Sequence, residues 1–270
     1  MLSEKTALLS KGLYKDIPDV ITLKSIPTAS ELDFVGSEDF DKTMLEVIFP
    51  QAIEEKFDYY SLLEIDYQWI CRCLRILNYG PYYTTNTIFC DKCNQVSTGE
   101  YIVDLRTINV LSLPDNFKND LEIKSDEFLD YEGSVKIKLL TMRETITAYS
   151  DPAFKMKDGK VNRELARICY MITQLGTRTG LTPIETKTIL LRDFSSADYI
   201  VLKDTVNDLT NYGLRAGGTA QCPKCGGEAT YIALVDDRFF RPTVGDLKRW
   251  RDDRRRGEAE NTTGNKTKAV

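Results

Sequence analysis

Two Cys-x-x-Cys units are the part of this chain whose residue types and spacing most clearly predict chemistry. They occupy residues 90–93 (CDKC) and 222–227 (CPKCGG). A gap of two residues lets both sulfurs of a tight turn bind one metal ion, and four such sulfurs complete the tetrahedral shell of zinc at about 2.3 Å. We therefore expect one structural zinc ion per chain, with Cys90, Cys93, Cys222 and Cys225 as its ligands.

The wide separation of the two units leaves alternatives open. Between Cys93 and Cys222 lie 128 residues, whereas compact zinc ribbons place about 15 to 20 residues between their pairs. Either a large insertion splits one ribbon, or each pair acts alone, as a redox dithiol or as structurally incidental cysteines. No thioredoxin-like context surrounds either pair. A site of four thiolates also accepts iron, and it is structural rather than catalytic because it keeps no open coordination position.

The other three cysteines are expected to fill the core. Cys71, Cys73 and Cys169 fall in predicted helices, where reduced cysteine packs as a small hydrophobic residue. Cys71 and Cys73 are two positions apart and therefore point to different sides of a helix.

The chain has no histidine among its 270 residues. This excludes Ser-His-Asp triads, Cys-His pairs, histidine-ligated metals and imidazole proton shuttles. No motif pairs the carboxylates either, so we expect a protein that is not an enzyme.

The charge is unevenly distributed along the chain. The net charge is −5, yet residues 241–270 carry nine basic and five acidic residues, which leaves about −9 on the rest. A net negative charge gives no general attraction for nucleic acid or an anionic membrane. The basic run from Arg249 to Arg256 could contact nucleic acid, but Asp252 and Asp253 dilute it, and a solvated face is the simpler interpretation.

The sequence predicts neither a membrane span nor a secretory signal. No apolar run reaches the ~18 residues that a bilayer requires, and residues 1–5 lack a basic-then-apolar pattern. We expect a cytoplasmic protein with reduced thiols.

Alternating strands are expected beside both cysteine units. Residues 87–89 and 100–105 flank the first unit and residues 230–234 follow the second, an arrangement of strand, turn and strand. A helix over 61–77 precedes them, and Ser61 with Glu64 is expected to form its capping box. Gly80 and Pro81 follow its end. Another strand is expected at 21–26.

Helices dominate the region between the two units. An acidic loop is expected at 112–134, a strand at 135–140 and a linker at 150–160. Helices are expected over 165–175, from Thr182 with Pro183 in its first turn, and over 199–209. After Pro242 we expect a short helix at 246–256 and a disordered tail from Glu258.

These elements predict an α+β fold, with helices around a split four-cysteine zinc ribbon and small antiparallel sheets. The segments are an N-terminal segment with a strand (1–60), a helix and the first ribbon half (61–111), an acidic loop, strand and linker (112–160), a helical insertion (161–213), the second ribbon half (214–240), and a basic, flexible tail (241–270).

Several motifs, in this order, resemble the baseplate hub protein family of T4-like contractile-tailed phages. They are Leu63 to Ile70, Leu74-Arg75, Phe89-Cys90-x-x-Cys93, Glu100-Tyr101-x-Val103-Asp104-Leu105, Val135 to Glu144, Cys222 to Gly226, Tyr231 to Leu234, and Asp237-Arg238-Phe239-Phe240. The resemblance covers about residues 20 to 240. The inserted Arg238 and the basic tail depart from the family pattern.

The resemblance implies a structural or assembly role in a tail baseplate. The implied partners are other phage tail and baseplate proteins in a larger assembly, with nucleic acid not expected. The implied location is the virion tail, or the host cytoplasm during assembly. The alternative is a zinc-ribbon protein that binds nucleic acid or acts in transcription, with the basic end as its contact. That alternative predicts binding that weakens steeply as salt rises.

Overall fold

A computed structural model describes residues 2–27, 39–90, 92–93, 95–214, 217–232 and 237–264. Helices and small antiparallel sheets are mixed in it, which confirms the predicted α+β class. Buried side chains form two cores. The first core combines the N-terminal residues with both ribbon halves and the C-terminal Phe239 and Phe240. The second core lies mostly in the chain between the two halves and also includes Leu9, Leu63 and Ile65.

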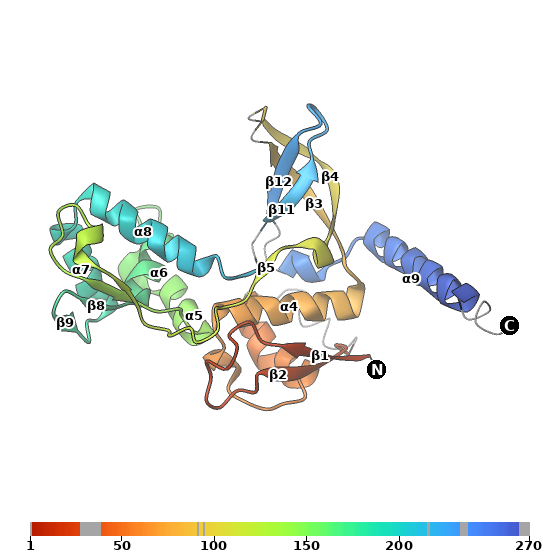
Figure 1. The fold of residues 1–270 in the computed structure, drawn as a ribbon, viewed down its shortest axis with the longest axis horizontal. Coiled ribbons are helices and arrows are strands. Elements are labelled where there is room, and N and C mark those ends of the chain that lie inside the picture. The colour runs from red at the N-terminus through yellow and green to blue at the C-terminus, as the bar shows by residue number, and fades with distance from the viewer. Residues whose placement is uncertain are drawn as a thin grey trace.

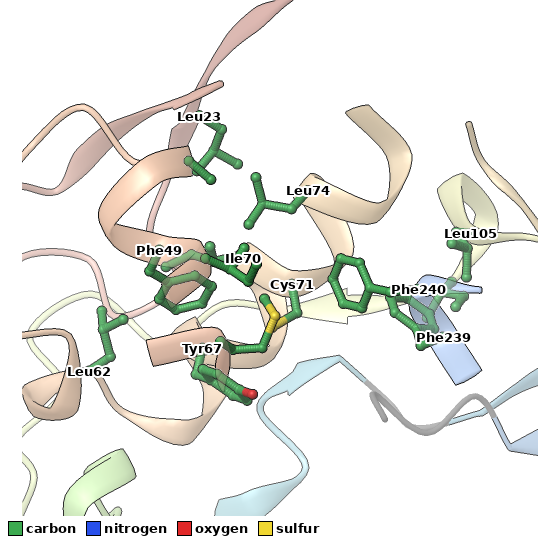
Figure 2. Packing of buried hydrophobic residues seen from close by; sticks show 14 of the residues in the cluster. Leu23, Phe49, Leu62, Tyr67, Ile70, Cys71, Leu74, Leu105, Phe239 and Phe240 are labelled. Atoms are coloured by element: carbon green, nitrogen blue, oxygen red, sulfur yellow. The ribbon is translucent and has the colours of Figure 1, made fainter. Parts of the chain in front are cut away.

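The first core is built around one long helix, α4 (Glu64–Tyr79). It lies between the hairpin of β1 (Ser3–Ala7) and β2 (Val20–Lys24) and the sheet that carries the cysteine units (Figure 1). The short helical turns α2 (Phe40–Thr43), a π-helical turn (Met44–Ile48) and α3 (Phe49–Ala52) close one side. Figure 2 shows Ile70, Cys71 and Leu74 of α4 between Phe49 and the Phe239-Phe240 pair.

The start of α4 differs from the prediction. Its N-cap is Leu63, which makes no side-chain capping bond. Ser61 belongs to a 3-10 turn (Tyr59–Ser61) and donates its hydroxyl to Asp58 at 2.7 Å. Glu64 instead pairs with Arg167 at 2.6 Å. The predicted capping box is therefore wrong, because Ser61 binds the nearby Asp58 and Glu64 binds the distant Arg167. The predicted end at Gly80, with φ +80°, is confirmed.

The cysteine units lie on a four-stranded antiparallel sheet, the ribbon sheet. Its order is β11 (Gly217–Gln221), β12 (Glu228–Ile232), β3 (Tyr82–Cys90) and β4 (Gln95–Asp104). The sheet projects from the body above α4 (Figure 1). Its base continues into the 3-10 turns Leu105–Thr107 and Asp237–Phe240. The strands predicted around both units are confirmed, except that residues 233 and 234 lie outside the described part.

The insertion, residues 112–212, separates the two ribbon halves. Its ends meet where β5 (Val110–Leu111) pairs with β10 (Gly213–Leu214). Beyond this pair lie a second sheet and four helices. The sheet has the order β6 (Leu121–Ile123), β7 (Val135–Ile137), β8 (Ile172–Leu175), β9 (Arg178–Thr179), and the helices are α5 (Met142–Ser150), α6 (Arg163–Met171), α7 (Pro183–Asp193) and α8 (Ser196–Thr210).

Two details of the insertion differ from the sequence prediction. The helix expected over 165–175 ends at Met171, and Ile172–Leu175 pairs with β7 as a strand. The expected linker at 150–160 contains the 3-10 turn Pro152–Phe154, whose Phe154 is buried in the second core. The predicted start of α7 at Thr182 is confirmed, and Thr182 and Glu185 form a capping box there. A 3-10 turn at Ser125–Glu127 lies in the acidic loop.

The C-terminal helix α9 (Val244–Gly264) is longer than the predicted helix at 246–256 and extends away from the body (Figure 1). Its beginning lies on the ribbon base, where Trp250 contacts Gly80. No helix in the part of the chain described here combines the length and apolar character needed to cross a membrane.

Candidate metal centre

The four predicted cysteines come together at the end of the ribbon sheet. The sulfur of Cys90 lies 3.6 Å from that of Cys225, and the sulfur of Cys93 lies 3.9 Å from that of Cys222. All four sulfurs are within 4.8 Å of one another. In a tetrahedron with metal–sulfur bonds of about 2.3 Å, the sulfurs are roughly 3.8 Å apart. The cluster therefore has the size of a four-thiolate metal site.

Pairing of β12 with β3 brings the two distant units together. Thr230 lies opposite Phe89 and Tyr231 opposite Ile88, in antiparallel register. Each strand thus places its own cysteine turn at the same end of the sheet. One split site, rather than two separate pairs, follows from this register.

The second unit forms a tight turn that directs N–H groups toward sulfur. The Cys222 N–H donates to the Gly227 carbonyl at 2.8 Å, and the Gly226 N–H donates back to the Cys222 carbonyl at 2.9 Å. Gly226 has φ +67°, a conformation that side chains other than glycine rarely adopt. Backbone N–H groups of Cys225 and Lys224 lower the pKa of Cys222 to about 6. Gly226, the residue after the second cysteine, therefore permits this tight turn.

The charge of the cluster favours a cation at its centre. Burial and hydrogen bonding with the other three sulfurs raise the pKa of Cys93 to about 12. The Cys222 thiol ionises readily whereas the Cys93 thiol resists ionisation, because thiolates this close repel one another. A divalent cation removes that repulsion, so the donor set fits a metal ion that prefers sulfur ligands, such as zinc.

The remaining cysteines do not join this cluster. Cys71 and Cys169 are buried in the first and second core, and Cys73 packs against the first. Burial raises the pKa of Cys169 to about 12 and that of Cys73 to about 11. Unreactive core thiols are the expected behaviour of such groups, as the sequence analysis predicts.

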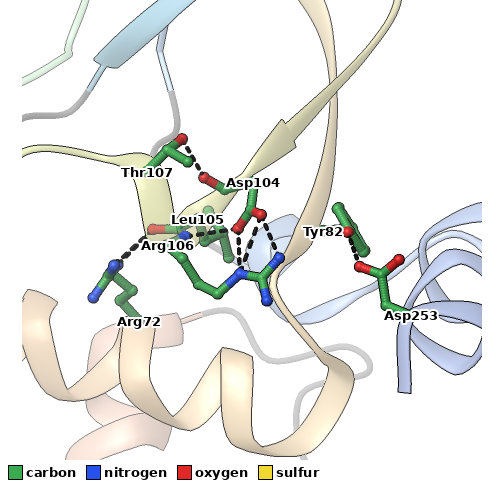
Figure 3. Close-up of polar contacts among 7 residues, drawn as sticks. All are labelled: Arg72, Tyr82, Asp104, Leu105, Arg106, Thr107 and Asp253. Atoms are coloured by element: carbon green, nitrogen blue, oxygen red, sulfur yellow. Dashed lines mark hydrogen bonds and ion pairs between the residues drawn. The ribbon is translucent and has the colours of Figure 1, made fainter. Parts of the chain in front are cut away.

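Two buried arginines of α4 hold the base of the ribbon sheet, and sequence reasoning assigned them no role. Arg75 donates to the carbonyls of Gly80, Tyr82 and Phe239, each at 2.7 Å. Arg72 donates to the Leu105 carbonyl at 2.9 and 2.7 Å (Figure 3). These carbonyls belong to the segments that enter and leave both ribbon halves. Burial lowers the pKa of Arg75 to about 10, so it stays charged at neutral pH.

A second set of polar contacts closes the ribbon base on its outer side. Arg106 forms a bidentate pair with Asp104, and the Tyr82 hydroxyl donates to Asp253 of α9 (Figure 3). The guanidinium of Arg106 also lies 5.8 Å from the Tyr82 ring centre. The end of β4, the start of β3 and α9 are thus joined at one place.

The arrangement is that of a closed metal site. Within the described residues, Cys90, Cys93, Cys222 and Cys225 are the group of metal-ligating side chains that could hold an ion. Four thiolates fill a tetrahedral shell, which leaves no position for a substrate or a water. The chemistry available here is a cross-link between two parts of the chain that are distant in sequence.

Comparisons with protein-family models, with curated proteins and with solved structures find no match to this chain, so the resemblance to the baseplate hub family stays a prediction.

Proposed function

We propose that the chain is a structural or assembly component of a contractile phage tail baseplate, stabilised by one zinc ion bound to Cys90, Cys93, Cys222 and Cys225. The zinc site is supported by the cluster of four sulfurs, whose spacing and donor type match a closed thiolate site. Structural zinc in small domains contributes ~10 kcal/mol or more to folding. The ion would connect the two ribbon halves across the insertion.

A role in protein binding is supported by apolar residues on the surface of the insertion. Leu191 is 69% exposed and Ile200 is 57% exposed, and both border a groove of about 490 Å³ between α6, α7 and α8. Leu165, Leu190 and Phe194 line the same groove. Grouped exposed apolar side chains are typical of contacts between proteins, which fits a component of a larger assembly.

The metal part is tested on the purified chain. Zinc per chain is counted by elemental analysis, and alkylation followed by mass spectrometry identifies the protected cysteines. We expect one zinc ion, with protection of the four proposed ligands. Bound iron would show that the ion is not zinc. A metal-free protein in which all four ligand cysteines are freely alkylated would refute the site.

The assembly part is tested by association with contractile tails. Tagged protein is produced together with a contractile-tailed phage, and tails are separated on a density gradient. We expect the wild-type chain to sediment with tails or baseplates, and the variant L191D/I200D to remain with free protein.

Leu129→Asp is the matched control for this variant. Leu129 is 76% exposed but does not line the groove, so the control should still sediment with tails. A wild-type chain that stays with free protein in every gradient would contradict the proposal.

A further inference from the structure

The helix α9 sorts its charges onto two faces. Asp246 is buried, with 2% of its surface exposed. Its carboxylate accepts hydrogen bonds from the Thr84 hydroxyl at 2.7 Å and from the Thr243 N–H at 2.9 Å. Asp253 accepts the Tyr82 hydroxyl. With Trp250, these acids recur at four- and three-residue spacing and share the face that lies on the ribbon base.

The opposite face is basic and exposed. Lys248, Arg251 and Arg255 recur at three- and four-residue spacing, and Arg249, Arg254 and Arg256 lie beside them; all six are exposed. From Val244 to Arg256, Asp252 is the one acid on this side, 3.7 Å from Arg251. We call the six residues the basic face.

We propose that the basic face of α9 binds the phosphates of double-stranded DNA. A helix of 21 residues is about 32 Å long and roughly 10–12 Å wide. Because α9 meets the ribbon base through Asp246, Trp250 and Asp253, the exposed basic face on its other side can approach a major groove about 12 Å wide. From Lys248 to Arg255 the helix rises about 10 Å, the length of roughly three phosphates along one strand.

The energetics favour a polyanion of high charge density over an acidic protein surface. Exposed ion pairs between proteins contribute only about 0–1 kcal/mol each. On DNA, each phosphate contact also releases a condensed counterion, which is a favourable term that scales with the number of contacts.

Duplex DNA fits better than single strands or double-stranded RNA. Binding of single strands relies on open aromatic faces, but the Trp250 ring lies against Gly80 and under the Arg254 guanidinium, 5.6 Å from the ring centre. The major groove of A-form RNA is too narrow for side chains to read.

The negative charge of the body does not prevent this contact. At 0.1 M salt, interactions between exposed charges are largely screened beyond about 10 Å. The six basic residues lie on the sides of α9 that are turned away from the ribbon base, which Asp246 and Asp253 contact. Screening therefore weakens the effect of the more distant acids of the body on them.

The test measures anisotropy of a labelled 20-base-pair duplex with the zinc-loaded full chain at 50 to 200 mM KCl. Wild type should bind at 50 mM and weaken about 10²- to 10³-fold by 200 mM, with a log–log slope between about −3 and −5. The variant K248Q/R251Q/R255Q should lose about three units of that slope. The matched control K155Q/K157Q/K160Q removes three exposed lysines from the insertion and should leave binding unchanged.

Asp252→Asn supplies a gain-of-binding arm. Removing the negative charge of Asp252 from the exposed side of α9 should tighten DNA binding several-fold at 50 mM salt. A folding defect cannot produce this result. Circular dichroism and zinc content verify the fold of each variant. The proposal is overturned by no binding at 50 mM, by an equal loss in the lysine control, by tenfold preference for single-stranded DNA, or by equally strong binding of polyglutamate.

Discussion

Replacing Cys222 with serine removes one sulfur of the proposed zinc site and opens the cross-link between the two ribbon halves. The closed loop contains the 128 residues between Cys93 and Cys222. The loop-entropy relation for a cross-link of this length gives about 5 kcal/mol of stabilisation through the unfolded chain. We expect the variant to lose zinc and, from the opened cross-link alone, about 5 kcal/mol of unfolding free energy, a large fraction of the stability of an ordinary domain.

The informative assay is hydrogen exchange followed by mass spectrometry, because it reports on each half separately. Since Phe89 lies opposite Thr230 in the sheet, protection should fall together around residues 86–90 and 228–232. Cys169→Ala is the control: it alters a buried thiol of the second core and should keep one zinc ion, with changes confined to the insertion. Unchanged exchange near Phe89 in the Cys222→Ser variant would refute the shared site.

Three further predictions concern the scaffold. In Gly80→Ala the new Cβ would lie 2.3 Å from the Trp250 ring, on a backbone with φ +80°. We therefore expect α9 to undock, which should shift the fluorescence of Trp250 to the red in a Trp69→Phe background. Gly159→Ala, at φ +81° with nothing within 4 Å, should cost only about 1–2 kcal/mol of backbone strain and leave the fluorescence unchanged. Arg75→Lys leaves buried carbonyls without donors and should lower the unfolding free energy by about 2–4 kcal/mol in urea titrations. An unfolding free energy within about 0.5 kcal/mol of wild type would count against the role of Arg75 in holding the ribbon base. The pKa of Asp198 is lowered because hydrogen bonds from Ser195 and from backbone N–H groups outweigh the effect of burial. Its stabilising contribution is therefore present above pH 3.8 and lost as the pH falls through the folded pKa. Asp198→Asn should destabilise at pH 7, with a loss that shrinks as the pH falls below 3.8 in urea titrations, and a loss that does not change with pH would contradict this.

The sequence predicted the parts of this fold that depend on local pattern. The two cysteine turns, their flanking strands and the start of α7 at Thr182 follow from short-range residue preferences, and the structure has each of them. The assembly of four cysteines into one cluster was also predictable, since a chain without histidine offers few other complete ligand sets.

The sequence could not reveal features that depend on tertiary partners. Ser61 and Glu64 match a capping box, but Glu64 pairs with Arg167, 103 positions away, and Ser61 with Asp58 three residues before it. The role of Arg75 depends on carbonyls up to 164 positions away. Likewise, Asp253 counts against a basic surface in a linear reading, yet its contact with Tyr82 turns it to the inner face of α9.

The insertion also imposes an order on synthesis. The first cysteine pair leaves the ribosome 128 residues before the second, which at about 5–20 residues per second is a delay of roughly 6 to 26 seconds. During this time β3 lacks its β12 neighbour and two thiols lack their partners. The helices of the insertion can fold in that interval because the other residues of their core, Leu9, Leu63 and Ile65 among them, are already synthesised. Closure of the ribbon by the metal ion that we propose would therefore be a late event, and the nascent first half would be the stage most exposed to oxidation and to mispairing of its strand edge.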